Sequence, residues 1–127
     1  MNRRKPQERR QYPRINSVVP VNIIANGYDF VTSTQNVSCV GAYCHVSKYI
    51  PPFTRIAVKL RLPIASGNQS KNHSVECKGV VVRSEDAQAN GFNIAIFFNA
   101  IQSGQRKIIS QYVKQFLPLQ SPVAKRV

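Results

Sequence analysis

The strictest constraint on the fold lies in residues 54–62, where apolar and basic side chains alternate along the chain. The apolar set is Ile56, Val58, Leu60 and Leu62, and the basic set between them is Arg55, Lys59 and Arg61. Because successive side chains of a β-strand point to opposite faces, the alternation predicts a half-buried strand with a basic outer face.

A second strand signal surrounds Asn26-Gly27, which separates two apolar segments. Both central residues of the preferred two-residue hairpin turn need a positive φ angle, and an Asn-Gly pair meets that need well. We therefore expect residues 18–25 and 28–34 to pair as an antiparallel hairpin.

Other apolar segments predict the remaining strands and a helix. We expect strands at 42–47, 74–83 and 92–98, a turn-rich connector at 35–41, a polar loop at 63–73 and a turn at 84–91. Apolar residues recur at helical spacing from Ile108 to Leu117 and predict an amphipathic helix that ends before Pro118. Six short strands followed by one helix indicate a mostly β fold, either a small antiparallel barrel or a sandwich, capped by the helix.

The charge of the chain is strongly positive and unevenly placed. The 127 residues carry a net charge of +13, and six bases against one acid give residues 1–14 a local charge of +5. Such an excess favours an anionic partner: nucleic acid, an anionic membrane surface or a phosphorylated ligand. Pro6 and Pro13 interrupt the basic segment and favour extended chain. The predicted organisation is a basic arm over residues 1–16, a domain over 17–117 and a basic tail over 118–127.

Residues that would support catalysis or metal binding are few. Apart from Glu8 in the arm, the acids are Asp29, Glu76, Glu85 and Asp86, and the cysteines are Cys39, Cys44 and Cys77. The histidines and cysteines show no nucleophile–base arrangement, no CxxC pair and no tetrahedral zinc spacing. We therefore expect no enzyme activity, no metal and no cofactor.

The sequence also predicts where the protein resides. The basic N-terminus is followed by Pro, Gln and Glu instead of an apolar stretch, and no apolar run approaches the roughly 20 residues that span a bilayer. An odd number of cysteines without paired spacing fits a reducing compartment. We expect a soluble, cytoplasmic protein.

Arginines in the arm form the first candidate binding motif. Arg10 and Arg14 lie four residues apart, roughly 13 Å along an extended chain, and Arg9 directly precedes Arg10. A guanidinium group bonds phosphate oxygens or the O6/N7 edge of guanine in bidentate fashion, and it stacks on purine faces. On this motif alone, a nonspecific phosphate-binding arm remains an alternative.

The second candidate motif is Asn36-x-Ser38-x-x-Gly41. Asn36 and Ser38 alternate onto one side of an extended segment and present an amide and a hydroxyl together. Gly41 allows either a positive φ angle or a close backbone approach to a ligand. The alternative is an ordinary turn in which Asn and Ser bond their own backbone.

Together, the two motifs resemble the signature of the PilZ family, which is RxxxR in an N-terminal loop followed, after a β-hairpin, by [D/N]xSxxG. Arg10 and Arg14 match the first part, and Asn36, Ser38 and Gly41 match the second. The strand ending Val80-Val81-Val82-Arg83 and the segment 91–98 also resemble later parts of the family. The resemblance covers roughly residues 8–117.

The resemblance implies a six-stranded antiparallel β-barrel of the split-barrel type, with a C-terminal helix, that binds the bacterial second messenger cyclic-di-GMP. By this analogy Arg10 and Arg14 hold phosphate and a guanine edge, and Asn36 and Ser38 contact a guanine. Many members carry Asp where this chain has Asn36. A carboxylate accepts both the N1–H and N2–H of guanine, whereas an amide offers one acceptor oxygen, so a lower affinity is expected.

Further expectations concern stoichiometry and signalling. Arg9 supplies a third guanidinium, which predicts that the arm accepts two stacked ligands. We expect the ligand to order the arm and a downstream effector protein to recognise the result. Two alternatives remain. One is a small barrel that binds nucleic acid, although this chain lacks an evident aromatic platform on which bases could stack. The other is a PilZ-like adaptor that binds no nucleotide.

Overall fold

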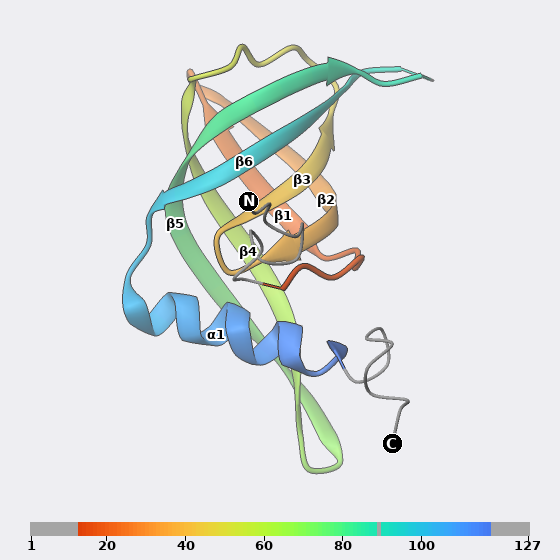
Figure 1. The fold of residues 1–127 in the computed structure, drawn as a ribbon, viewed down its shortest axis with the longest axis vertical. Coiled ribbons are helices and arrows are strands. Elements are labelled where there is room, and N and C mark those ends of the chain that lie inside the picture. Colours follow the sequence, from red (N-terminus) through yellow and green to blue (C-terminus); the bar gives the residue numbers. More distant parts are fainter. Residues whose placement is uncertain (1–12, 89, 118–127) are drawn as a thin grey trace, which may run out of the picture.

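Six antiparallel strands close into a ring in the computed structural model, which describes residues 13–88 and 90–117 (Figure 1). The elements are β1 (Pro20–Ala25), β2 (Tyr28–Ser38), β3 (Gly41–Val46), β4 (Arg55–Ser66), β5 (Gln69–Asp86), β6 (Phe92–Ala100) and α1 (Ser103–Lys114). The order around the ring is β1-β2-β3-β6-β5-β4, and pairing of β4 with β1 closes it. The predicted mostly β fold, a six-stranded antiparallel barrel with a C-terminal helix, is confirmed.

The alternation that predicted β4 is realised residue by residue. Ile56, Val58, Leu60 and Leu62 are buried, and Arg55, Lys59 and Arg61 are exposed. The other strands send their own apolar sets inward, so the centre of the ring is filled by aliphatic side chains. This burial supplies the main favourable term in folding.

The hairpin predicted at Asn26-Gly27 is confirmed. The φ angles of these residues are 51° and 82°, and β1 pairs with β2 directly up to Ala25 and Tyr28. Both positive angles match the twist of a tight two-residue hairpin.

The predicted polar loop at 63–73 is wrong, because this segment is a β-hairpin. β4 continues to Ser66 and β5 begins at Gln69, with Gly67-Asn68 as the turn. The far end of the hairpin projects from the ring beyond α1 (Figure 1). Since most of its side chains face solvent, apolar alternation is absent there and backbone pairing alone defines the strands.

Smaller differences affect other boundaries. The expected connector at 35–41 is mostly strand, because β2 runs to Ser38 and only residues 39–40 turn. The expected turn at 84–91 begins later, since β5 extends to Asp86. Helix α1 starts before its apolar stripe, at Ser103.

Helix α1 packs against β2, β4 and β5 and buries Ile109, Tyr112 and Val113. Two glutamines tie it to the projecting hairpin. The Oε1 atom of Gln105 accepts a hydrogen bond from the Glu76 backbone N–H at 2.7 Å. The amide of Gln115 accepts from the Ala65 N–H at 2.7 Å and donates to the Pro63 carbonyl at 3.2 Å. Its side chain therefore pairs with the edge of β4 as a neighbouring strand would.

The end of the N-terminal arm is docked on the ring. Ile15 is fully buried, and its backbone exchanges two hydrogen bonds with Val37, each 3.1 Å long. The buried hydroxyl of Thr34 donates to the Ser17 carbonyl at 2.7 Å and accepts from the Val19 N–H at 3.1 Å. The side chain of Ser17 in turn bonds the hydroxyl of Tyr112. The segment after the arm is thus held by both β2 and α1.

Candidate ligand-binding site

Four residues of the two predicted motifs line one hollow of about 240 Å³ on the outside of the ring. They are Arg14, Asn36, Ser38 and Gly41. The remaining members of the arginine motif, Arg9 and Arg10, lie outside the described residues. The hollow brings residues 14 and 36–41 together because Ile15 pairs with Val37, between Asn36 and Ser38.

A bulge in β2 sets the direction of Asn36. The pairing with β3 shifts between Thr34, which faces Cys44, and Asn36, which faces Tyr43. Gln35 is the extra residue. Without the bulge, Asn36 would share the inward face of Thr34, because residues two apart in a strand share a face. The bulge turns Asn36 to the outer surface, where it is half-buried.

Ser38 has a structural role in addition to lining the hollow. Its hydroxyl accepts a hydrogen bond from the Val40 N–H at 3.2 Å, which stabilises the turn between β2 and β3. The side chain is only 2% exposed. The turn alternative considered for this motif therefore holds for Ser38, whose O–H is still able to donate to a ligand.

Gly41 is required by packing between strands. A Cβ atom added there would lie 2.3 Å from the carbonyl oxygen of Ile96 on β6. Gly41 is not among the positive-φ residues, so the positive φ angle allowed for it is not found. The close approach that needs glycine is to the β6 backbone.

A row of four outward side chains crosses the hollow. Across the strands, Asn36 faces Tyr43, Tyr43 faces Ala95, and Ala95 faces Arg83. With strands spaced about 4.8 Å apart, the row spans roughly 14 Å. The small side chain of Ala95 leaves a depression between the ring of Tyr43 and the guanidinium of Arg83.

A second bulge, in β5, places Arg83 in this row. The pairing with β6 shifts between Val81 and Arg83, so that Val81 is buried while Val82 and Arg83 are both exposed. A regular strand would direct Arg83 inward with Val81. The two bulges therefore act alike, because each redirects a polar side chain toward the same hollow.

Tyr43, Arg83 and Glu85 form a linked group at the rim. The Arg83 guanidinium lies 5.9 Å from the centre of the Tyr43 ring and forms a 3.0 Å ion pair with Glu85. The Tyr43 hydroxyl donates to Glu85 at 3.2 Å. Partial burial, and then the Glu85 carboxylate, raise the pKa of Tyr43 above its usual value, so the hydroxyl remains a donor. Because the ion pair is exposed, it is weak, and an anionic ligand can compete for Arg83.

Sequence reasoning missed Tyr43 and Ala95 as site residues and noted Arg83 only as part of the resemblance. An aromatic residue in a predicted strand gave no functional signal. Only the register between β3, β6 and β5 reveals that these three side chains are neighbours of Asn36.

The described residues give no sign of a metal site. In segments 13–88 and 90–117, no three His, Cys, Asp or Glu side chains are grouped so that they could hold a metal ion. The three cysteines are free. Burial raises the pKa of Cys44 to about 12 and that of Cys77 to about 11, so both thiols are protonated at neutral pH.

Helix α1 is too short to cross a membrane. Within the part of the chain that the structure describes, no helix combines the necessary length with the necessary apolar character.

Comparisons with known proteins give three findings. The family model described as "PilZ domain" matches residues 8–115. No curated protein matches the sequence. Among solved structures, the Bacillus subtilis inhibitor of motility (MotI/DgrA) is 20% identical with a TM-score of 0.74, over 93% of this chain and 53% of that one. The PilZ domain of YcgR from Escherichia coli, solved with c-di-GMP, is 11% identical with a TM-score of 0.60, over 94% and 99% of the two chains. This chain spans about half the length of the MotI/DgrA chain, and at these identities the likenesses show the fold.

Proposed function

This chain belongs to the PilZ domain family, a family of cyclic-di-GMP receptors, and on that basis we propose that it binds cyclic-di-GMP in the hollow around Asn36 and signals to an effector protein. PilZ domains are regulatory binding domains and not enzymes, so the proposed activity is recognition without catalysis. The observation that carries the proposal is the convergence of Arg14, Asn36 and Ser38 on one hollow, although they lie up to 24 positions apart in sequence.

The proposed roles follow from side-chain chemistry. Arg10 and Arg14 hold a phosphate group and a guanine edge, as their bidentate guanidinium groups allow. Asn36 accepts from a guanine through its amide oxygen, and the Ser38 hydroxyl donates to the ligand. We add Arg83 as a further guanidinium, because its place beyond Ala95 lets it reach a second phosphate.

The size of the hollow bears on how the ligand sits. Sites that enclose a small molecule usually measure roughly 300–1,000 Å³, whereas this hollow measures about 240 Å³. We therefore propose that the hollow holds one part of the dinucleotide and that the arm, with Arg9 and Arg10, covers the rest. Arg9 supports the further proposal that two stacked ligands bind, since a stacked pair carries four phosphate charges.

The adaptor alternative has one observation in its favour. Ser38 and Gly41 have structural reasons of their own, in the Val40 turn and in the contact with Ile96. Two of the three residues of the second motif would therefore persist in a protein that binds no nucleotide. Asn36 has no such role, because the structure records no hydrogen bond from its side chain to another described residue. A ligand partner gives this half-buried amide a function.

Calorimetric titration with cyclic-di-GMP, with GTP and a short oligonucleotide as controls, tests the proposal. We expect selective binding of cyclic-di-GMP, with a stoichiometry of two ligands per chain. An Ala95→Leu variant fills the hollow from its surface side and is expected to weaken binding while the fold persists. A folded wild type that fails to bind at high ligand concentration would leave the adaptor as the function, and one ligand per chain would remove the stacked pair.

Salt dependence separates this function from nucleic-acid binding. A protein that contacts 6–10 phosphates loses roughly 10³–10⁵ in affinity between 50 and 200 mM salt. A receptor for a compact dinucleotide neutralises few charges, so its affinity should change much less. We further propose that the protein acts in the cytoplasm, where its free cysteines remain reduced.

A further inference from the structure

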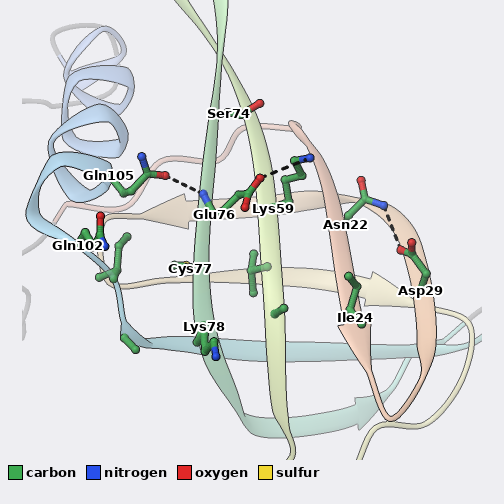
Figure 2. Close-up of a pocket in the computed structure, with 14 residues that line it drawn as sticks. Asn22, Ile24, Asp29, Lys59, Ser74, Glu76, Cys77, Lys78, Gln102 and Gln105 are labelled. Atoms are coloured by element: carbon green, nitrogen blue, oxygen red, sulfur yellow. Dashed lines mark hydrogen bonds and ion pairs between the residues drawn. The ribbon is translucent and has the colours of Figure 1, made fainter.

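A second and larger hollow lies on the opposite part of the ring surface, over β1, β4 and β5, and we name it the β1–β4–β5 hollow. It measures about 1230 Å³ and shares no residue with the hollow around Asn36. Figure 2 shows it bounded on one side by Gln102 and Gln105 at the start of α1 and on the other by Asn22 and Asp29. None of the motif residues lies in it.

The register of the strands explains the shape of this hollow. One outward row runs from Asn22 through Lys59 to Glu76, and the next runs from Ile24 through Ala57 to Lys78. Ala57 is the smallest side chain at the centre of the second row. The surface is therefore depressed over Ala57, with exposed Ile24 beside it.

Apolar side chains form part of the floor. Ile24 is 50% exposed, and Ala57, Ala100 and Ile101 also line the hollow. An exposed apolar area framed by polar side chains is typical of a protein contact surface.

Basic side chains outnumber acidic ones in and beside the hollow, because Arg55 and Arg61 flank the lining residues Lys59, Lys78, Asp29 and Glu76. Lys78 lies in the hollow, and Arg55 and Arg61 stand on the same outer face of β4 on either side of it. Within residues 13–88 and 90–117, none of these three side chains has an ion-pair partner. Of the two acids in the hollow, Glu76 is in an ion pair, whereas Asp29 is bonded to a neutral amide and keeps its negative charge. Glu76 pairs with Lys59 at 3.5 Å, and Asp29 accepts a hydrogen bond from Asn22 at 3.1 Å (Figure 2).

We propose that the β1–β4–β5 hollow is the docking surface for an acidic segment of a partner protein, with one apolar side chain seated over Ala57 and carboxylates facing Lys78, Arg55 and Arg61. The side-chain N–H₂ of Gln105 adds a donor, because its oxygen is already bonded to Glu76 N–H. This inference gives a location to the effector of the proposed function, and it rests on that function only for the need of a partner.

Three other occupants fit less well. At about 1230 Å³ the hollow exceeds the roughly 300–1,000 Å³ of usual small-molecule sites. Nucleic acid would find no aromatic side chain among the lining residues on which to stack a base. A second copy of the chain would add a charge of +13 to an equal charge.

The test uses NMR spectroscopy of the full chain with defined probes at 150 mM salt. The first probe is a twelve-residue peptide that repeats Glu-Leu-Glu-Ser, and the second replaces every Glu by Gln. An oligonucleotide of matched charge is the third. We expect the Glu peptide to shift the amide signals of Ile24, Ala57 and Ala100 most strongly and the Gln peptide to have little effect. Equal effects of the two peptides, or preferential binding of the oligonucleotide here, would overturn the proposal.

Two charge reversals separate a specific surface from the general attraction of a basic protein. Lys78→Glu lies in the hollow, whereas Lys71→Glu makes the same change on the opposite face of β5, where it pairs with buried Ile64. We expect Lys78→Glu to lower the affinity for the Glu peptide about threefold to tenfold, because an exposed ion pair is lost and replaced by a repulsion. We expect Lys71→Glu to leave this affinity nearly unchanged. Equal loss in both variants would mean nonspecific attraction and refute the docking surface.

Cyclic-di-GMP titration of the same variants keeps the two proposals apart. Lys78→Glu should bind the dinucleotide as the wild type does, because Lys78 is not part of the Asn36 hollow. Failure of all cyclic-di-GMP binding would refute the proposed function and leave the peptide result standing. Loss of peptide selectivity with normal cyclic-di-GMP binding would refute the docking surface alone.

Discussion

Ile15 and Val37 exchange two backbone hydrogen bonds, so the C-terminal end of the arginine arm is fixed to strand β2 between Asn36 and Ser38. This relationship refines the proposed ordering of the arm. The side chain of Ile15 is fully buried, which anchors this contact. We therefore propose that the segment that orders on binding ends at Arg14.

Amide hydrogen exchange tests this boundary. We predict that the Ile15 and Val37 amides are protected in the free protein and that residues 3–14 become protected only with cyclic-di-GMP. Ordering costs roughly 1–2 kcal/mol per residue in backbone entropy, which charge-assisted bonds to phosphate have to offset. Strong protection of residues 3–14 without ligand would show a preformed arm, and the signal would then have another origin.

Substitution of the arm arginines should affect binding and not folding. We predict that Arg10→Ala and Arg14→Ala each weaken cyclic-di-GMP binding by about 1.5–3 kcal/mol, the range for hydrogen bonds to charged groups. Arg61→Ala, an exposed arginine on β4, serves as the control and should bind normally. Titration gives the affinities, and circular dichroism checks the fold. A folded double variant with wild-type affinity would exclude the arm from the site.

Asn36 offers a gain-of-affinity test. Asn36→Asp supplies a second acceptor for the guanine N–H groups, and we predict binding tighter by about 1 kcal/mol, near the value of one added hydrogen bond. Asn36→Ala should weaken binding. Since the side chain is half-buried at the surface, neither change should alter the melting temperature by much. If both variants bind as the wild type does, Asn36 does not contact the ligand.

A substitution at Gly41 tests whether this glycine is needed for packing independently of ligand binding. We predict that Gly41→Ala lowers the free energy of unfolding by about 1–3 kcal/mol without ligand, because the new Cβ would press on the Ile96 carbonyl. Gly104→Ala in α1 is the matched control, since nothing lies within 4 Å of its added Cβ. There, alanine should stabilise the helix by up to about 1 kcal/mol. Denaturant unfolding gives the free energy of unfolding of both variants. A value for Gly41→Ala equal to that of the wild type would contradict the close contact with Ile96.

Burial of Cys44 predicts a loss of stability at alkaline pH. Its folded pKa is raised to about 12 from a usual value of 9.0. The stability that the buried neutral thiol contributes is fully present below the pKa of Cys44 in the unfolded state. It is lost as the pH rises toward the pKa of Cys44 in the folded state. From pH 9 to 10, the free energy of unfolding of the wild type should fall about 1 kcal/mol more than that of Cys44→Ala. If the free energy of unfolding falls equally with pH in the wild type and in Cys44→Ala, this prediction is contradicted.

The sequence predicted those parts of the fold in which side-chain burial alternates. Residues 55–62 and the Asn26-Gly27 turn were predicted correctly because each residue there has one clear environment. The hairpin around Gly67 was missed because it stands in solvent, where burial leaves no pattern and only backbone hydrogen bonds define the strands.

The candidate site was predictable only where it follows local motifs. Arg14, Asn36, Ser38 and Gly41 were identified through two short motifs and their resemblance to the PilZ signature. Tyr43 and Arg83 depend on ring closure and on the bulge after Val81, which changes the phase of the strand without a sequence signal in its apolar residues. Cross-strand neighbours are a property of register, and register is set by the whole ring.

The glutamine contacts of α1 have a consequence for self-association. Ring closure hides strand edges only where all six strands overlap, and the hairpin of residues 61–76 extends past β1 and β6. There Gln105 and Gln115 bond the Glu76 and Ala65 backbone, and Pro63 presents no N–H at the edge. An uncovered edge of this kind is a template for another chain. The helix therefore also covers this strand edge, and a chain cut after Gln102 would leave the edge exposed and tend to aggregate through the hairpin.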